Sequence, residues 1–104
     1  MLVLRPNCRL CGCDLPPDST KARICSYECT YCSDCVDGEL QNVCPTCGGG
    51  FVPRPIRPRK SWRPERQVGL EHHPATTERE GLLFSKEDIA QFVARIKDIP
   101  PEER

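Results

Sequence analysis

Eight of the nine cysteines in this 104-residue chain occur as close pairs, and their spacing limits the possible folds more than any other feature. Three pairs have two residues between the cysteines and one has three. The pairs are Cys8/Cys11, Cys25/Cys29, Cys32/Cys35 and Cys44/Cys47. Two intervening residues let one turn hold a metal with both thiolates, and four thiolates in a tetrahedron suit Zn²⁺. The spacing therefore predicts two structural zinc ions.

The spacing leaves open which pairs share a metal. Sequential pairing would combine the first pair with the second and the third with the fourth. However, only two residues separate Cys29 from Cys32 and Cys32 from Cys35. Such crowding is expected when the ligands alternate between two metals.

Three further residues could bind metal. Cys13 is either a reactive thiol or substitute ligand beside Cys11, or a free thiol near a metal-binding loop. The second interpretation is favoured, because eight cysteines already fill two zinc sites. His72 and His73 follow a proline-stiffened segment and are expected to be solvent-exposed.

The composition indicates that the domain needs metal ions in order to fold, and the proposed sites make a catalytic role unexpected. Only 38% of residues are hydrophobic and 6% aromatic, which is little for the core of a small domain. Without metal, the cysteine-rich part should be unfolded. A zinc with four protein ligands has no open position for water or substrate, so the chain is not expected to be an enzyme.

The sequence predicts a cytoplasmic protein. The apolar run at residues 1–4 is too short for a secretory signal. No stretch approaches the roughly 18 apolar residues of a membrane span. In a reducing compartment, an odd number of cysteines favours metal binding over disulfides.

Composition and charge divide the chain into four segments. The cysteine-rich head carries a net charge of −2, a proline-rich arm carries +5, and the residues after the arm carry −3. We expect a short strand at 21–24 in the head and helical turns within 36–43, where Val36, Leu40 and Val43 recur. The segments are 1–50 (head), 51–67 (basic arm), 68–84 (irregular and mobile) and 85–99 (amphipathic helix and tail).

The last segment has a clear helix signal. Ser85 and Asp88 resemble a capping box. An apolar stripe follows at helical spacing, formed by Ile89, Phe92, Val93 and Ile96. An isolated helix of this length is marginal in water, so it should dock on the head, on a second copy or on a partner.

The arrangement of the cysteines along the chain resembles that of an all-cysteine RING finger. Its order is C-x2-C, a long loop, C-x3-C, two residues, C-x2-C, a loop and C-P-x-C. The resemblance implies a small zinc-stabilised α+β fold of the treble-clef, cross-brace type. It also implies the ligand sets, with cysteine at position 29 where RING fingers usually have histidine. Site one would be Cys8, Cys11, Cys32 and Cys35, and site two Cys25, Cys29, Cys44 and Cys47.

A longer resemblance covers about residues 1–58. Three stretches of the chain are similar to a short bacterial family known only as a domain of unknown function with RING-like cysteines. These stretches are LRPNC, DLPPDSTKARICSYECTYCSDCV and VCPTCGG. That family implies a fold and no established activity.

The favoured function is binding another protein of unknown identity. In RING ligases, residues corresponding to Leu10 and Pro45 help to bind the conjugating enzyme, so a ubiquitin-type ligase-like adaptor is one alternative. Simple packing is favoured for each of these two residues. The apolar stripe of the helix is a second candidate contact surface.

Two other functions remain open. The basic arm could bind nucleic acid through arginines surrounding one stackable aromatic side chain. A solvated linker is favoured instead, because the chain as a whole is not basic. The arm residues are Arg54, Arg57, Arg59, Lys60, Trp62, Arg63 and Arg66. The last alternative is a thiol/zinc redox sensor, although no βαβ pattern accompanies the CxxC motifs.

Overall fold

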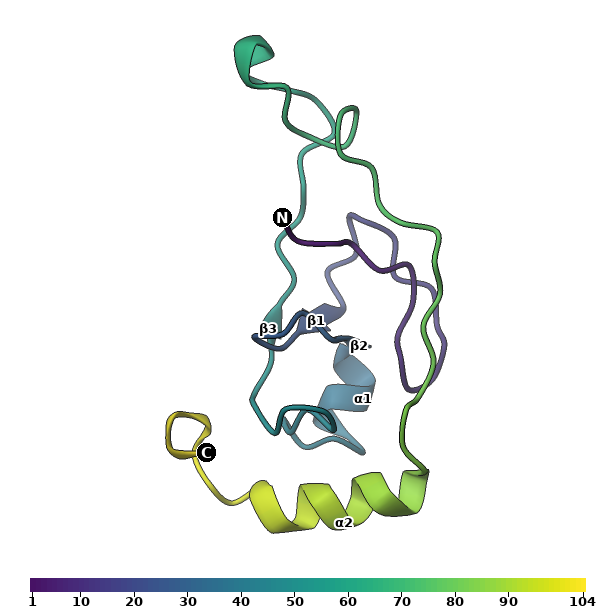
Figure 1. Ribbon diagram of the computed structural model, residues 1–104, viewed down its shortest axis with the longest axis vertical. Coiled ribbons are helices and arrows are strands. Elements are labelled where there is room, and N and C mark those ends of the chain that lie inside the picture. The colour runs from purple at the N-terminus through teal and green to yellow at the C-terminus, as the bar shows by residue number, and fades with distance from the viewer.

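A small three-stranded antiparallel sheet forms the centre of the head in the computed structural model, which describes residues 1–104 (Figure 1). The sheet consists of β1 (Ala22–Ile24), β2 (Thr30–Cys32) and β3 (Val52–Pro53), in the order β2-β1-β3. The arm therefore contributes an edge strand, a role the sequence did not indicate. Proline is tolerated there because an edge strand has one side free of ladder hydrogen bonds.

The first helix, α1 (Ser33–Asp37), begins earlier than the apolar spacing predicts. Cys32 caps it, since its Sγ accepts a hydrogen bond from the Cys35 N–H. Gln41 and Asn42 adopt positive φ angles of 47° and 60°, which do not continue a right-handed helix. All three apolar residues of the predicted turns are nevertheless buried: Val36, Leu40 and Val43. Their spacing therefore predicted which positions are buried, but it did not correspond to one continuous helix.

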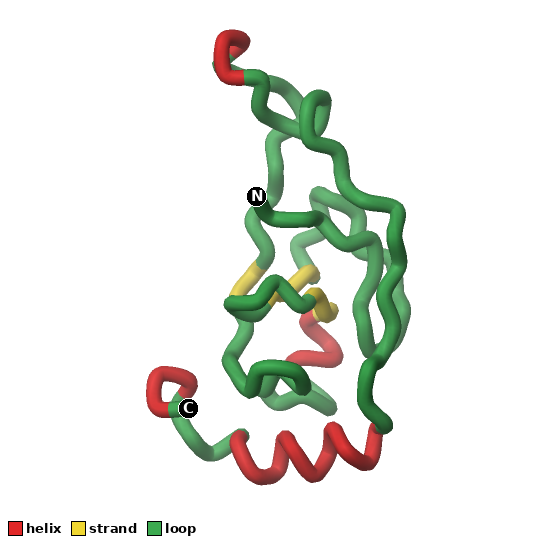
Figure 2. The backbone as a smooth tube through the Cα atoms, viewed as in Figure 1, coloured by secondary structure: helices red, strands yellow, loops and turns green.

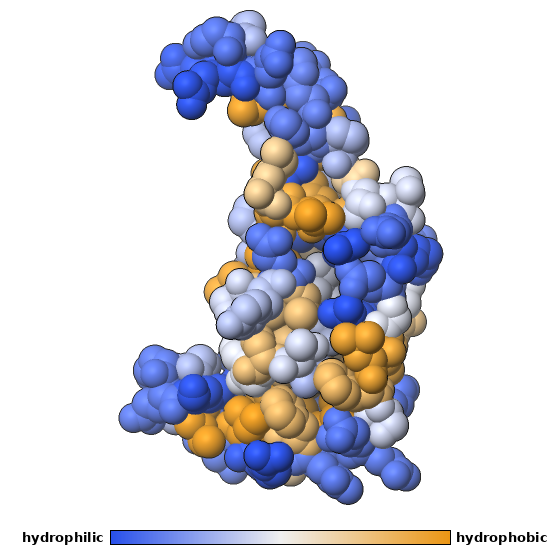
Figure 3. All heavy atoms as spheres, viewed as in Figure 1, coloured by the Kyte–Doolittle hydropathy of each residue, from blue (hydrophilic) through white to orange (hydrophobic).

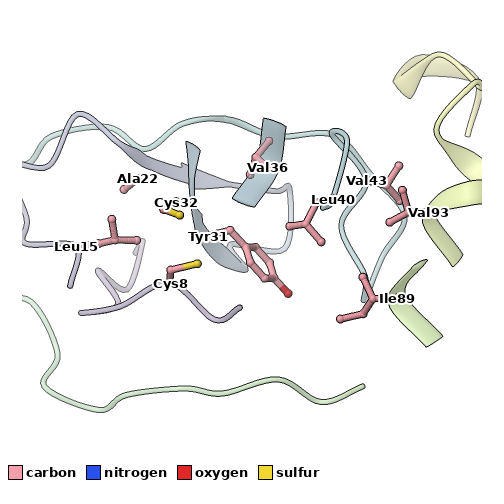
Figure 4. Packing of buried hydrophobic residues seen from close by; sticks show 10 residues of the cluster. All are labelled: Cys8, Leu15, Ala22, Tyr31, Cys32, Val36, Leu40, Val43, Ile89 and Val93. Atoms are coloured by element: carbon pink, nitrogen blue, oxygen red, sulfur yellow. The ribbon is translucent and has the colours of Figure 1, made fainter. Parts of the chain in front are cut away.

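The second helix, α2 (Lys86–Ile96), lies across the end of the head (Figure 1). The Ser85 hydroxyl accepts a hydrogen bond from the Asp88 N–H at 3.1 Å, which is the expected N-terminal cap. Ile89 and Val93 are each only 2% exposed and belong to the core cluster (Figure 4). Of the docking alternatives, the structure therefore shows the helix on its own head.

The core is small. Only 19 of the 104 residues are buried, and the main cluster combines head residues with two residues of α2. Apart from Cys8 and Cys32, the cluster consists of Leu15, Ala22, Tyr31, Val36, Leu40, Val43, Ile89 and Val93. This apolar content agrees with a domain that needs a further source of stability.

The irregular segment 68–84 contains no helix or strand, and Figure 2 shows it as loop. Within it, Arg79 and Glu80 contact the head. Glu80 forms ion pairs with Arg5 and Arg9, and its backbone is bonded to the side chain of Asn7. Arg79 pairs with Asp14 at 2.7 Å. These polar contacts join residues far apart in the sequence, which a local pattern does not reveal.

Residues 59–71 project from one end of the molecule, which measures 48 × 27 × 18 Å. We call this projection the lobe. It contains the 3₁₀ helix η1 (Pro64–Arg66), and Figure 3 shows that end covered by hydrophilic residues. A second 3₁₀ helix, η2 (Pro101–Glu103), follows α2. None of the helices has both the length and the hydrophobicity that a membrane crossing requires.

Candidate metal centres

The first group of thiols, which we call cluster one, joins an N-terminal loop to the sheet. The sulfurs of Cys8, Cys11, Cys13 and Cys32 all lie within 4.8 Å of one another. Cys8, Cys11 and Cys13 come from the loop, whereas Cys32 ends β2 and caps α1. Cys35 follows in α1, with its backbone N–H bonded to the Cys32 sulfur. Cluster one therefore includes Cys13, which the sequence interpretation set aside, whereas the sulfur of Cys35, predicted for site one, lies outside the 4.8 Å group.

A tight backbone turn, knuckle one, brings the loop cysteines together. The Cys8 N–H donates to the Cys13 carbonyl at 2.8 Å, and the Gly12 N–H donates to the Cys8 carbonyl at 2.9 Å. Gly12 has a φ of 80°, a conformation that side chains with a Cβ rarely adopt. The turn therefore points several sulfurs to one side without regular secondary structure.

The second group, cluster two, contains the sulfurs of Cys25, Cys44 and Cys47, again within 4.8 Å of one another. Cys25 follows β1, and Cys44 and Cys47 belong to a second turn. Cys29 lies beside Cys25 and Cys44, where burial raises the pKa of its thiol and the neighbouring Cys25 raises it further. The sulfur of Cys29, predicted for site two, lies outside the 4.8 Å group, and the cysteines of the two clusters alternate along the chain.

The turn of cluster two, knuckle two, has the same hydrogen bonds as knuckle one. The Cys44 N–H donates to the Gly49 carbonyl, and the Gly48 N–H donates to the Cys44 carbonyl, both at 2.8 Å. Gly48 has a φ of 78°, close to that of Gly12. The shared sequence pattern is C-x-x-C-G-x, in CRLCGC and CPTCGG. Its last position is Cys13 in one knuckle and Gly49 in the other, a signal that could have identified Cys13.

The donor sets fit zinc. Zn–S bonds of about 2.3 Å in a tetrahedron place neighbouring sulfurs about 3.8 Å apart. The Cys11 and Cys32 sulfurs are 3.7 Å apart. Both clusters could hold a metal ion, and thiolate sulfur is a ligand type that suits zinc.

The protonation of the thiols depends on a bound cation. Burial raises the pKa of Cys35 and Cys44, which keeps these thiols neutral in the metal-free protein. The backbone N–H of Cys13 lowers the pKa of Cys11 to about 7. Metal binding requires thiolates and therefore releases protons from the buried thiols.

The structure buries three of the six residues proposed as partner contacts and half-buries the other three. Pro45 is buried, and Leu10 is half-buried against the core cluster. Ile89 and Val93 are buried, and the half-buried side chains of Phe92 and Ile96 pack against the same cluster. These contacts stabilise the fold and leave the partner surface to be sought elsewhere.

The basic arm does not act as one surface. Arg54 is 3% exposed and donates to the carbonyls of Arg5, Leu15 and Pro16. Arg57 donates to the carbonyls of Leu2 and His73. These two arginines therefore bind the chain itself, while the other five residues of the proposed set lie exposed in the lobe: Arg59, Lys60, Trp62, Arg63 and Arg66.

Comparison with known proteins identifies a family and a relative that the chain resembles. A family model described as "Protein of unknown function (DUF1272)" matches residues 1–57, more than half of the chain. "Uncharacterized protein R02474" of Rhizobium meliloti (strain 1021) is 48% identical over 79 residues, covering 76% of this chain and 84% of that protein. No solved structure matches the chain.

Proposed function

The chain belongs to the family described as Protein of unknown function (DUF1272), and we propose that it is a zinc-stabilised module that binds another protein without catalysis of its own. Two cysteine groups that could hold metal support two structural zinc ions in a RING-like cross-brace. The odd number of cysteines, nine, favours metal binding in a reducing compartment such as the cytoplasm. One observation carries the binding role: the lobe presents an exposed tryptophan on an ordered backbone.

The metal content can be measured directly. Protein purified without added metal should carry one zinc ion for each of the two clusters when weighed by mass spectrometry under native conditions. Cys44→Ser removes a buried thiol of cluster two and should lower the content by one ion. A single metal in the unaltered protein, or disulfides in place of metal, would contradict the two-site assignment.

The backbone of the lobe is held by its own hydrogen bonds. The Ser61 N–H donates to the Glu71 carboxylate at 2.6 Å, and the Ser61 hydroxyl accepts from the Val68 N–H at 3.2 Å. At the neck, the Leu70 N–H donates to the Pro58 carbonyl at 2.8 Å. A Cβ on Gly69 would lie 2.7 Å from the Lys60 carbonyl oxygen, so glycine is required there. This ordering reduces the conformational entropy lost on binding.

The side chains on this backbone are those that dominate protein interfaces. Trp62 is 77% exposed, and tryptophan and arginine are enriched among residues that contribute most to binding. Lys60, Arg63 and Arg66 have no ion-pair partner within the chain. The lobe carries four basic and two acidic residues. The excess of positive charge on the lobe favours binding to an acidic surface of a partner protein.

A pull-down from an extract of the source organism tests the lobe. Trp62→Ala should lose a protein that the unaltered chain retains, because the aromatic anchor is removed while the hydrogen-bonded backbone remains. Raising the salt concentration should weaken retention, since exposed charges are screened. Tyr27→Ala is the matched control, because Tyr27 is 78% exposed and lies outside the lobe. Equal retention by Trp62→Ala and the unaltered chain would exclude the lobe as the contact.

The nucleic-acid alternative rests on the same exposed residues, since arginines beside a tryptophan can also grip a phosphate backbone. Nuclease treatment of the extract separates the two. Retention that survives nuclease supports a protein partner, and retention that nuclease abolishes supports nucleic acid. The ligase-like adaptor has less support, because Pro45 is buried and Leu10 packs on the core.

A further inference from the structure

We infer that cluster one is a peroxide-responsive centre, in which Cys13 and Cys11 form a disulfide and the cluster then loses its metal while cluster two keeps its own. This inference rests on the proposed zinc content of both clusters. It goes beyond a purely structural role because it assigns a chemical function to one of the two sites.

The first observation is a surplus of ligands. A tetrahedral zinc takes four thiolates. Cluster one holds four sulfurs within 4.8 Å of one another. The Cys35 thiol lies outside that group, beside the thiols of Cys32, Cys11 and Cys8. Whichever four of these five thiols bind the zinc ion, the fifth stays uncoordinated next to the four ligands. An uncoordinated thiol at this distance needs only a small movement to reach a neighbouring sulfur.

The second observation is access. Cys11 and Cys13 are both exposed, whereas Cys8 and Cys32 are buried. The exposed pair lines a surface pocket of about 670 Å³, together with Cys32 and Cys35. Within cluster one, a small oxidant dissolved in water therefore reaches these two loop cysteines before Cys8 and Cys32.

The third observation is the comparison within the chain. Knuckle two repeats the backbone hydrogen bonds and the positive-φ glycine of knuckle one. Gly49 occupies the position of Cys13, so cluster two has three grouped sulfurs, with Cys29 beside them, and no surplus thiol. The protein thus contains its own reference site, which has the same turn but lacks the additional sulfur.

The chemistry is a two-electron oxidation by hydrogen peroxide. Cys13 reacts as the thiolate: its sulfur attacks the peroxide, the O–O bond breaks, and the leaving hydroxide takes up the proton that the thiol released, which gives a sulfenic acid and one water. Cys11, also as the thiolate, then attacks that sulfur, forming the S–S bond, and the leaving hydroxide takes up the Cys11 proton to become a second water. Two thiols and one peroxide become one disulfide and two waters. Three thiols remain in cluster one, fewer than a closed tetrahedral site needs.

The experiment treats the metal-loaded full chain with a small excess of hydrogen peroxide and follows metal content by native mass spectrometry. Peptide mapping locates the disulfide. We expect the loss of one metal ion, a disulfide between Cys13 and Cys11, and recovery of the metal after reduction with added zinc. Cys13→Ser should keep both metals under the same treatment.

The reciprocal variant is Gly49→Cys, which adds the missing thiol to knuckle two. Gly49 lacks a positive φ, and a Cβ there would lie 3.3 Å from the Cys47 sulfur, a close contact that a small shift relieves. This variant should lose both metals to peroxide. If it does not fold, the comparison of the unaltered chain with Cys13→Ser remains decisive.

Several outcomes would overturn the inference. One is equal metal loss from the unaltered chain and Cys13→Ser, and another is a disulfide that excludes Cys13. A third is a Cys13→Ser protein that already lacks one metal before oxidation, which would make Cys13 an essential ligand and leave no surplus thiol. The metal content measured before peroxide tests the proposed zinc sites separately, so failure of one proposal is distinguishable from failure of the other.

Discussion

Removing metal with a chelator is expected to unfold the head and to melt α2 with it. Structural zinc sites contribute on the order of 10–16 kcal/mol of apparent binding free energy in small peptides. Whole domains are typically stable by only about 5–15 kcal/mol. The core cluster of this chain has few apolar members and includes two cysteine thiols, Cys8 and Cys32. Apolar burial alone therefore should not hold the head together.

The loss of α2 makes the unfolding easy to observe. The helix has 11 residues, and isolated helices shorter than about 12–15 residues are marginal in water. Its buried residues pack on the head, so it should lose its structure when the head does. Far-ultraviolet circular dichroism should lose its helical signal on chelation and regain it when zinc is restored. A helical signal unchanged in chelator, with metal loss verified by mass spectrometry, would contradict a metal-dependent fold.

Arg54→Ala is expected to destabilise the metal-loaded protein by about 2–4 kcal/mol, a range typical of breaking a buried hydrogen-bond network. The guanidinium donates to three backbone carbonyls, those of Arg5, Leu15 and Pro16, at 2.9–3.2 Å. Removing it leaves those oxygens without a donor and detaches the arm from two loops. Burial lowers the pKa of Arg54, because removing the guanidinium from water disfavours its charged form. The hydrogen bonds to the carbonyls therefore have to offset this cost.

Urea unfolding of the metal-loaded protein measures this effect as a lower transition midpoint. Arg59→Ala is the control, because its side chain is 83% exposed and the substitution should leave the midpoint nearly unchanged. Arg54→Lys should recover only part of the loss, since one ammonium group does not reproduce the planar fork of donors. Equal midpoints for Arg54→Ala and the unaltered chain would show that the carbonyls find other donors.

The parts of the structure that a sequence predicts are those encoded by local spacing. Close cysteine pairs indicated metal clusters, and the Ser85 cap with its apolar stripe indicated α2. The start of α1 could not be predicted from apolar spacing, because a cysteine sulfur caps that helix. The spacing of Val36, Leu40 and Val43 marked buried positions along a chain that turns instead of continuing as a helix.

The remaining features depend on contacts between distant segments. Arg54 lies in a run of arginines and prolines that resembles a solvated linker, yet it is buried because three carbonyls from other segments converge on it. Cys13 looked superfluous when the paired cysteines were counted, and only the folded knuckle brings its sulfur next to three others. The irregular segment gave no periodic signal, because isolated polar contacts with the head hold it in place.

The division of the chain into cysteine-rich and cysteine-free parts has a consequence for biosynthesis. Every thiol of both clusters lies at or before Cys47, whereas the segment that seals the N-terminal loop comes later, with Glu80 bonded to a residue 73 positions earlier. Chains are synthesised from the N-terminus, and early parts can fold first. The head can therefore bind metal on the ribosome before the ion pairs of Glu80 exist. The supply of zinc, rather than the closing of a long loop, then sets when a nascent chain becomes resistant to proteolysis.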